Sequence, residues 1–312
     1  MALASSAWAQ ADWPGRPISL IVPFSAGGSL DGTARLVAQK LGERLKQQVV
    51  VENLTGAGGE VGMMKTIQAR PDGSTFLISG DAALNPAAPR GGPYYRHDVL
   101  KELQPVVLVN TAPMVLVSHP SLPAKNLAEL VALARRQPGK LSYATSGIGT
   151  LPHLATEMLK QQGRIHMVHI PYRGGSQIAN DVAGNQVDLA MLIAASALPF
   201  VQSKALKPIA VTGAKRLALF PDVPAAAETP GFQGYEVVSW AGIYAPPNTP
   251  PALVGRMARE VDEVLKLPDV REKLAQAGAL PGGGAPADFA RFIEQDRARF
   301  TRAIEAGISL RE

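Results

Sequence analysis

Short hydrophobic runs alternate along this chain with longer stretches whose apolar positions recur every three or four residues. The first run, residues 18–22, predicts a buried strand, and residues 30–45 have the spacing of an amphipathic helix. Further strands are predicted at residues 48–53, 75–79, 141–144, 168–170, 186–193 and 206–211. Because helical stretches separate most of these strands, we predict an α/β fold with mostly parallel sheets and helices on their faces.

Two extended segments are long enough to leave one sheet and enter another. They span residues 104–117 and 235–244 and bracket the middle of the chain. We therefore expect two domains joined by two crossing strands, with residues 13–108 and 240–312 in the first and residues 109–239 in the second. Strand ends of both domains would then face one cleft, where open α/β sheets place ligands. A double crossover also permits hinge closure.

Composition excludes several classes of function. The 312 residues are 46% hydrophobic and 18% charged, as expected of a folded protein, and contain no cysteine, which excludes disulfides and thiolate metal sites. The net charge of +5 comes from scattered Lys and Arg, which argues against a nucleic-acid partner. Residues 1–12 are rich in alanine, with an Ala-x-Ala pattern. They are either the end of an export signal or an accidental alanine-rich terminus.

Three glycine turns follow predicted strands, at residues 25–28, 145–150 and 173–176. The first precedes a helix, so its free N–H groups lie beside a positive helix end and can hold an anion without a charged side chain. Backbone donors with Ser and Thr hydroxyls suit a carboxylate. The alternative is three ordinary strand-to-helix turns. Asp31 either complements its helix N-terminus or orients the Gly27–Gly28 turn.

Other chemistries have weaker support in the sequence. Glycines 56, 58 and 62 depart by one position from the dinucleotide fingerprint. Ser146 and His153 could form a hydrolytic pair, but no Gly-x-Ser-x-Gly elbow is present. His153 with Glu157, and His166 with His169, each offer only two ligands to a metal. We therefore expect no cofactor, no metal and no catalysis.

The chain resembles the Bug-type substrate-binding proteins, the extracytoplasmic receptors of tripartite tricarboxylate transporters. The resemblance extends over nearly the whole chain from Trp13. It rests on motifs that occur in order along the sequence: Pro-Phe-Ser-Ala-Gly-Gly at 23–28, Val-Glu-Asn-Leu-x-Gly-Ala-Gly-Gly at 51–59, Pro-Asp-Gly at 71–73, Tyr-Ala-x-Ser-Gly-x-Gly at 143–149, Pro-Tyr-Arg-Gly at 171–174, Gln-Val-Asp at 186–188, and Pro-x-Val-Arg-x-Lys-Leu at 268–274.

This resemblance implies a two-domain periplasmic-binding-protein fold that captures a small carboxylate in its interdomain cleft. In the family, the first and second glycine turns grip one carboxylate, partly through ordered waters. The implied ligand-binding residues are Phe24, Ala26, Gly27, Gly28, Thr145, Ser146, Gly149, Thr150, His153, Tyr172 and Asp188. Asp31 joins them because it can orient the first turn. Ser79 and Asn85 are added from their positions at the end of the third strand and in the loop beyond it.

One position departs from the family pattern. Leu192 occupies a site where many members place an acidic residue that can meet an amino or hydroxyl group. An ammonium against an apolar wall would be costly, so the resemblance favours a carboxylate with an apolar or aromatic body. We expect a periplasmic monomer that serves a membrane transporter. The alternatives are a receptor that signals to a sensor kinase and a hydrolase using Ser146 and His153.

Overall fold

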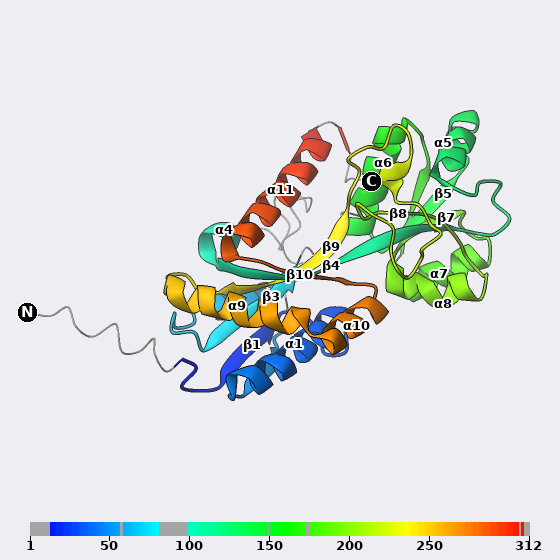
Figure 1. The fold of residues 1–312 in the computed structure, drawn as a ribbon. Coiled ribbons are helices and arrows are strands. Elements are labelled where there is room, and N and C mark those ends of the chain that lie inside the picture. The colour runs from blue at the N-terminus through cyan, green and yellow to red at the C-terminus, as the bar shows by residue number, and fades with distance from the viewer. Residues whose placement is uncertain are drawn as a thin grey trace, which may run out of the picture.

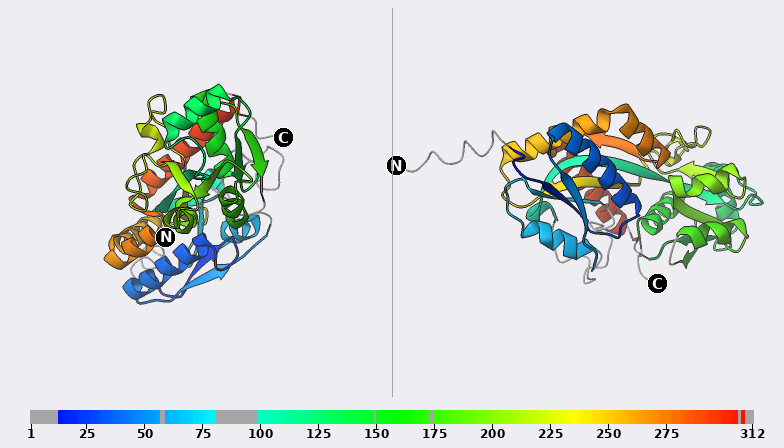
Figure 2. Two further views of the ribbon diagram at one scale, coloured as in Figure 1. Left: turned by 90° about the vertical axis from the view of Figure 1, so that its right-hand side faces the viewer. Right: turned by 90° about the horizontal axis from the view of Figure 1, so that it is seen from below.

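The computed structural model describes residues 13–56, 59–80, 99–148, 150–172, 175–305 and 307–308. Two lobes lie side by side, connected by two strands and by the C-terminal helix (Figures 1 and 2). The alanine-rich start at residues 1–12, Asn85 and Gly149 lie outside the described residues. Within the described part of the chain, no helix combines the length and the hydropathy required to cross a membrane.

The first lobe is built on strands in the order β2-β1-β3-β9-β4. Here β1 (Ile18–Val22), β2 (Val49–Asn53) and β3 (Thr75–Gly80) are parallel, and β9 (Val238–Ala245) pairs antiparallel with β3 and β4 (Gln104–Ser118). One face packs against α1 (Ser29–Leu45), α9 (Pro251–Lys266) and α10 (Pro268–Gln276), and the other packs against α2 (Glu60–Ile67) and the start of α11 (Pro286–Glu305). The short helix α4 (Val99–Glu102) precedes β4.

The second lobe surrounds the far half of β4. That half pairs with β7 (Leu189–Ile193) and β8 (Lys207–Val211), while β5 (Ser142–Thr145) lies between β7 and β6 (Val168–Pro171). One face packs against α5 (Leu127–Arg136), α6 (Leu151–Gly163) and the end of α11. The other packs against α7 (Gly175–Ala183) and α8 (Ala194–Gln202). A single 3₁₀ turn, η3 (Ala226–Glu228), lies in the connection from β8 to β9.

The predicted α/β architecture with two crossing strands is confirmed. Strand β4 pairs with β9 as far as Pro113 and with β7 from Met114 onward, so it leaves one sheet and enters the next. Its first half also pairs with β10 (Leu280–Gly283), which the sequence pattern does not predict. The C-terminal helix contributes Phe289 to the first lobe's core and Phe300 to the second lobe's core. The exact division of the chain into domains stays a prediction.

Strand direction determines which turns face one another. Strands β1 and β3 are antiparallel to β9 and therefore run with β4, toward the second lobe. Strands β5, β6 and β7 run against β4, toward the first lobe. The carboxyl ends of the two sets of strands thus face each other across the space between the lobes. The first two glycine turns follow β1 and β5, so they lie on facing edges.

Candidate functional site

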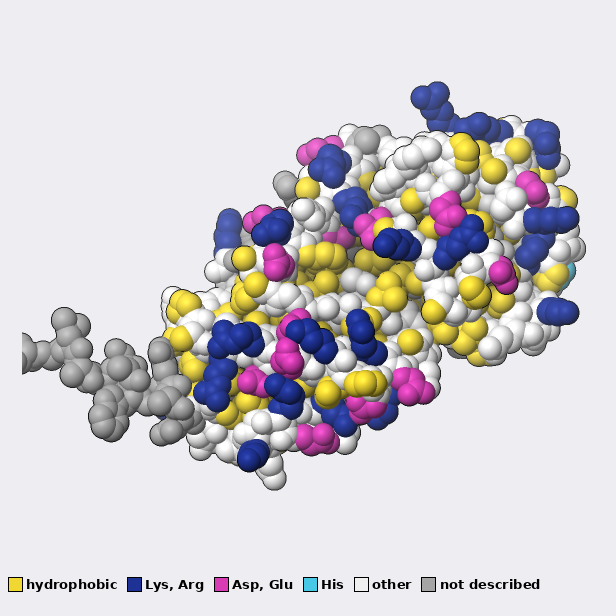
Figure 3. Space-filling model, viewed as in Figure 1, with side chains coloured by type: hydrophobic (Ala, Val, Ile, Leu, Met, Phe, Trp, Pro, Cys, Tyr) yellow, Lys and Arg dark blue, Asp and Glu magenta, His cyan; other side chains and the backbone are white. Residues whose placement is uncertain are grey.

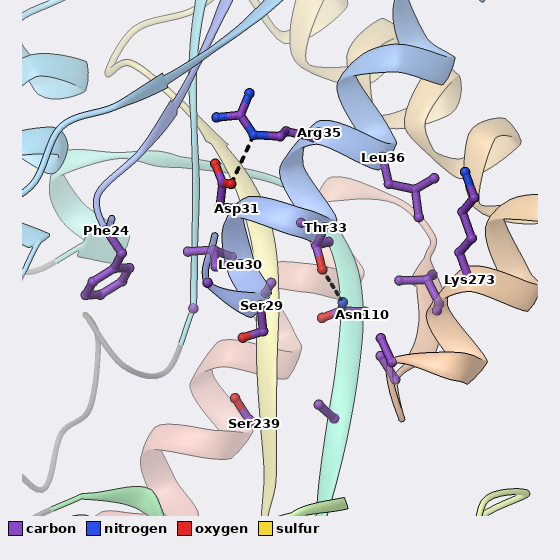
Figure 4. A pocket seen from close by; sticks show the side chains of 18 of the residues that line it. Phe24, Ser29, Leu30, Asp31, Thr33, Arg35, Leu36, Asn110, Ser239 and Lys273 are labelled. Carbon is purple, nitrogen blue, oxygen red and sulfur yellow. Dashed lines mark hydrogen bonds and ion pairs between the residues drawn. The ribbon is translucent and has the colours of Figure 1, made fainter. Parts of the chain in front are cut away.

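A cavity of about 660 Å³ lies at the first lobe's facing edge. It is bordered by the turn after β1, the first turns of α1, the crossing strands and α10 (Figure 4). Its lining includes Phe24, Gly28, Ser29, Asn110, Ser239 and Lys273. In the space-filling view, hydrophobic side chains gather across the middle of the molecule, between charged side chains on either lobe (Figure 3). The cavity therefore combines polar groups at one helix end with an apolar wall.

The turn after β1 presents the start of α1 to this cavity. Gly28 is the N-cap residue, with extended backbone angles (φ −77°, ψ 167°), and no side chain caps the helix. Residues 25–29 are exposed. The first N–H groups of a helix lack intrahelical partners and carry the positive end of its dipole. The N–H groups that follow Gly27 are thus placed to receive an anionic ligand atom.

Asp31 holds this turn from beneath. Its buried carboxylate accepts hydrogen bonds from the Gly27 N–H (2.9 Å), Arg35 Nε (3.0 Å) and Asn53 Nδ2 (2.9 Å). Asn53 also donates to the Phe24 carbonyl oxygen at 3.0 Å. The hydrogen bonds from Arg35, Gly27 and Asn53 lower the pKa of Asp31 to about 2. These contacts support the hypothesis that Asp31 orients the turn, and they occupy the Gly27 N–H, which leaves the following N–H groups for a ligand.

Arg35 and Asn53 were not among the predicted site residues. Arg35 lies one helical turn after Asp31, and Asn53 ends the neighbouring strand β2. The spacing of Asp31 and Arg35 was a detectable signal, because residues four apart on a helix are neighbours. The contribution of Asn53 depends on β2 pairing beside β1, where Asn53 lies opposite Val22.

Two buried polar side chains lie on β3 and β4, the strands on either side of β9. Ser79, near the end of β3, is 1% exposed, and its Oγ has no hydrogen-bond partner among the described residues. Asn110, on β4, is 6% exposed and donates from Nδ2 to Thr33 Oγ1 at 3.3 Å, which links the crossing strand to α1 (Figure 4). Gly80 lets β3 approach β9 closely, since a Cβ there would lie 1.8 Å from the Trp240 carbonyl oxygen.

The second lobe presents its own turn at the facing edge. Thr145 Oγ1 lies 2.6 Å from His169 Nε2, and Thr150 Oγ1 donates to the Gly147 carbonyl oxygen at 2.7 Å. These contacts hold the turn, while Ser146 is exposed. The Tyr172 N–H donates to the Thr145 carbonyl oxygen at 2.9 Å, which brings the end of β6 beside the turn.

A stack of aromatic rings supports this second turn. His169 lies between Tyr143 and His153, with ring centroids 4.9 and 4.1 Å away. Burial and the nearby His153 lower the pKa of His169 to about 4, and burial also lowers the pKa of His153. Both rings are therefore neutral at pH 7. The described residues contain no group of three or more His, Cys, Asp or Glu that could hold a metal ion.

Two predicted residues, Asp188 and Leu192, do not lie in the facing turns. Asp188 accepts hydrogen bonds from the N–H and Oγ of Ser142 at 2.7 and 2.8 Å, and both residues lie where β7 and β5 begin, at the opposite end of these strands from the cleft. Leu192 is 4% exposed and packs in the core with Val115 and Ile178. The structure thus places Asp188 away from the facing turns, whereas Leu192 lies near the carboxyl end of β7 and is buried in the core.

Comparison with known proteins gives consistent matches over most of the chain. The sequence model described as "Tripartite tricarboxylate transporter family receptor" matches residues 33–308. The protein BugT of Bordetella pertussis is 33% identical over 300 residues, covering 96% of this chain and 92% of BugT. The solved structure of R. palustris Rpa4515 with adipate has a TM-score of 0.78 at 32% identity, covering 95% of this chain and 99% of that one. The periplasmic binding protein BugD has a TM-score of 0.73 at 31% identity, with coverage of 95% and 99%.

Proposed function

This chain belongs to the tripartite tricarboxylate transporter receptor family, and from that premise we propose that it captures a small organic carboxylate between its lobes and delivers it to the membrane subunits of such a transporter. It is a periplasmic solute-binding protein of the Bug type and not an enzyme. Relatives solved with adipate and with malate support a carboxylate as the ligand.

One observation carries the proposal: the uncapped N-terminus of α1 borders the cavity at the carboxyl edge of the first lobe's sheet, and strand direction puts the turn after β5 at the opposing edge of the second lobe. In our proposal the ligand carboxylate accepts hydrogen bonds from the N–H groups at Gly28 and Ser29, where the helix dipole adds a favourable field. The exposed Ser146 hydroxyl contributes a donor from the other side. Strand β4 pairs in both sheets, β9 returns the chain to the first lobe, and α11 packs on both lobes. Bending at these three segments closes the second lobe over the ligand in our proposal.

The body of the ligand lies along the apolar part of the cavity. Leu30, Ala112 and Leu274 line it beyond the turn. Removal of apolar ligand surface from water there contributes a favourable free energy of about 25 cal/mol per Å². Among the described residues that line this cavity, the only carboxylate an ammonium group on the ligand could meet is that of Asp31, whose oxygens already accept three hydrogen bonds. We therefore propose an organic acid without an amino group.

A thermal-shift series with mono-, di- and tricarboxylates tests this proposal. At a hundredfold excess over Kd, a ligand adds about 2.7 kcal/mol to the free energy of unfolding, which raises Tm by roughly 5 °C in a protein of this size. Isothermal titration calorimetry then measures Kd for each acid that shifts Tm. The proposal fails if no acid at millimolar concentration moves Tm or gives a binding heat.

A steric variant tests the location of the site. A Cβ at Gly28 would make only an ordinary contact, 3.6 Å from the Ser25 carbonyl oxygen, so Gly28→Leu should fold normally while its side chain covers the helix end. We expect Gly28→Leu to abolish the ligand-induced shift. Gly255→Leu is the matched control, since a Cβ there also has ordinary spacing (3.5 Å to Arg259 Nη1) and Gly255 does not line the cavity. Equal binding by both variants would place the carboxylate elsewhere.

A further inference from the structure

The cavity continues past the helix end into a groove between α1 and α10. An ion pair between Lys40 Nζ and Asp269 Oδ2, at 2.8 Å, joins the two helices at one end of their contact. One turn away along each helix, Leu36 and Lys273 both line the cavity. Another turn brings the small residues Gly32 and Ala277 to the lining, and small residues leave the groove open toward Ser29. The groove thus leads from the proposed carboxylate site to Lys273.

Lys273 lies at the distal part of this groove and has no ion-pair partner among the described residues. Its side chain is exposed, and no carboxylate among the described residues pairs with it, whereas Lys40 and Lys266 each pair with two. In the close-up, Lys273 lies beside Leu36 on one side of the pocket, and Phe24 lies on the other (Figure 4). A cation at this position can attract the far end of an elongated anionic ligand.

The span of the groove follows from helix geometry. Ser29 and Leu36 are separated by seven residues on α1, so at 1.5 Å per residue they lie about 10 Å apart along the axis. The wall on the side of α10 is apolar or small, formed by Gly32, Leu274 and Ala277. The polar side chains that also line the cavity bond to one another, Asp31 with Arg35 and Thr33 with Asn110. An acid whose carboxylate binds at Ser29 therefore needs an unbranched apolar body to reach Lys273.

We propose that Lys273 is a specificity-determining residue that binds a second carboxylate, at the far end of an elongated ligand. This inference rests on the proposed capture of the first carboxylate at the start of α1. In this arrangement different kinds of donor bind the two carboxylates of one ligand. The near carboxylate accepts from backbone N–H groups, and the distal carboxylate meets the mobile ammonium of Lys273. The distance between these two donors selects the chain length.

Calorimetry with a matched pair of acids tests the assignment. Adipate and hexanoate have the same chain length, and only adipate has a second carboxylate. We expect the wild-type protein to bind adipate about tenfold more tightly, a difference typical of one charged hydrogen bond. Lys273→Gln should remove this preference by weakening adipate binding about tenfold while leaving hexanoate binding unchanged. Lys273→Arg should retain part of the preference, since it keeps the charge.

Two further variants act as controls. Arg271→Gln removes an exposed cation from the same helix at a position that does not line the cavity, and it should leave both affinities unchanged. Gly32→Met places a helix-favouring side chain in the groove, where a Cβ would have no atom within 4 Å. It should fold normally and weaken both acids. The unfolding midpoint of each variant, measured in urea, verifies that its fold is intact.

The possible failures are distinguishable. If wild-type protein binds hexanoate as tightly as adipate, or if Lys273→Gln weakens both acids equally, Lys273 does not read a second carboxylate, while capture of the first carboxylate stands. A series from succinate to sebacate covers other chain lengths, and equal effects of Lys273→Gln on every diacid and its monoacid also overturn the inference. If no acid in either series binds, the proposed function itself fails and this inference fails with it.

Discussion

Replacement of Asp31 by Asn tests whether one buried carboxylate shapes the ligand-binding turn. The wild-type side chain accepts three hydrogen bonds, from Gly27, Arg35 and Asn53. Asn keeps the size of the side chain, but it offers one acceptor oxygen and turns an NH₂ group toward a donor. Oδ2 accepts from Gly27 and Arg35, and Oδ1 accepts from Asn53. An Asn oxygen that faces Gly27 and Arg35 therefore loses the hydrogen bond from Asn53, and the two that remain have a neutral acceptor in place of a charged one, where a hydrogen bond to a charged group contributes about 1.5–3 kcal/mol and a neutral one about 1 kcal/mol. We expect the free energy of unfolding to fall by about 3 kcal/mol.

Ligand binding by Asp31→Asn should weaken as well. With a neutral acceptor the hydrogen bond to its N–H weakens, so Gly27 regains backbone freedom, and ordering one residue again on binding costs about 1–2 kcal/mol. That range corresponds to about a 5- to 30-fold increase in Kd for the carboxylate. Urea denaturation measures the stability loss, and calorimetry with the acid identified by thermal shift measures Kd.

The pH dependence has a definite sign. The pKa of Asp31 is about 2 in the folded protein, below its ordinary value of 3.8. The stabilisation from its charged form is therefore fully present above pH 4 and is lost as the pH falls toward 2. The stability difference between wild type and Asp31→Asn should shrink over that interval.

Asp269→Asn is the matched control for this experiment. Asp269 also pairs with a cation, Lys40, but at the surface, where such pairs contribute at most about 1 kcal/mol. We expect this variant to keep the unfolding midpoint of the wild type and to bind the acid like wild type. The role assigned to Asp31 is refuted if Asp31→Asn also stays within 1 kcal/mol of wild type and retains the wild-type Kd.

Three further substitutions test other parts of the structure. Gly80→Ala should destabilise the protein by about 1–3 kcal/mol in urea, because its Cβ would lie 1.8 Å from the Trp240 carbonyl oxygen; an unchanged midpoint would contradict this close approach. Trp240→Phe removes the donor to buried Asp296 (2.9 Å) and should cost about 1–3 kcal/mol, which the same assay measures; a neutral effect would show that this hydrogen bond adds no stability. The pKa of His169 is about 4 when folded and 6.5 ordinarily, so its contribution to stability should be full above pH 6.5 and lost as the pH falls to 4. In His169→Gln that acid-induced loss of Tm should be smaller than in wild type, and an identical pH profile would refute this contribution.

Local patterns predicted most secondary-structure elements of this protein. Periodicity located α1, β1 and β3 within one residue of their observed bounds. Leu-Pro-Gly-Gly, at residues 280–283, has no strand pattern, yet it forms β10 because the first half of β4 provides an edge to pair with. The sequence pattern located the turn after β1, because the residues of the glycine turn and of the helix start are adjacent along the chain.

The site prediction was also limited by features that depend on strand position, strand pairing and helix packing. Asp188 precedes its strand, so it lies at the end of the sheet opposite the facing turns, and its position before β7 was a signal of that placement. Leu192 lies within β7, where alternation directs it into the core. The contact of Asn53 with Asp31 could not be predicted from sequence, because it depends on strand pairing. The position of Lys273 beside the cavity could not be predicted either, because it depends on helix packing.

The sequence by itself determined the strand-turn-helix units, the two crossing strands and the chemistry of the glycine turns, since each depends on residues adjacent along the chain. Only the tertiary structure decided which strand ends face each other, which donors surround Asp31 and which helix places Lys273 beside the cavity. These features depend on pairing direction and packing between segments far apart in the chain, and local residue preferences carry no information about either.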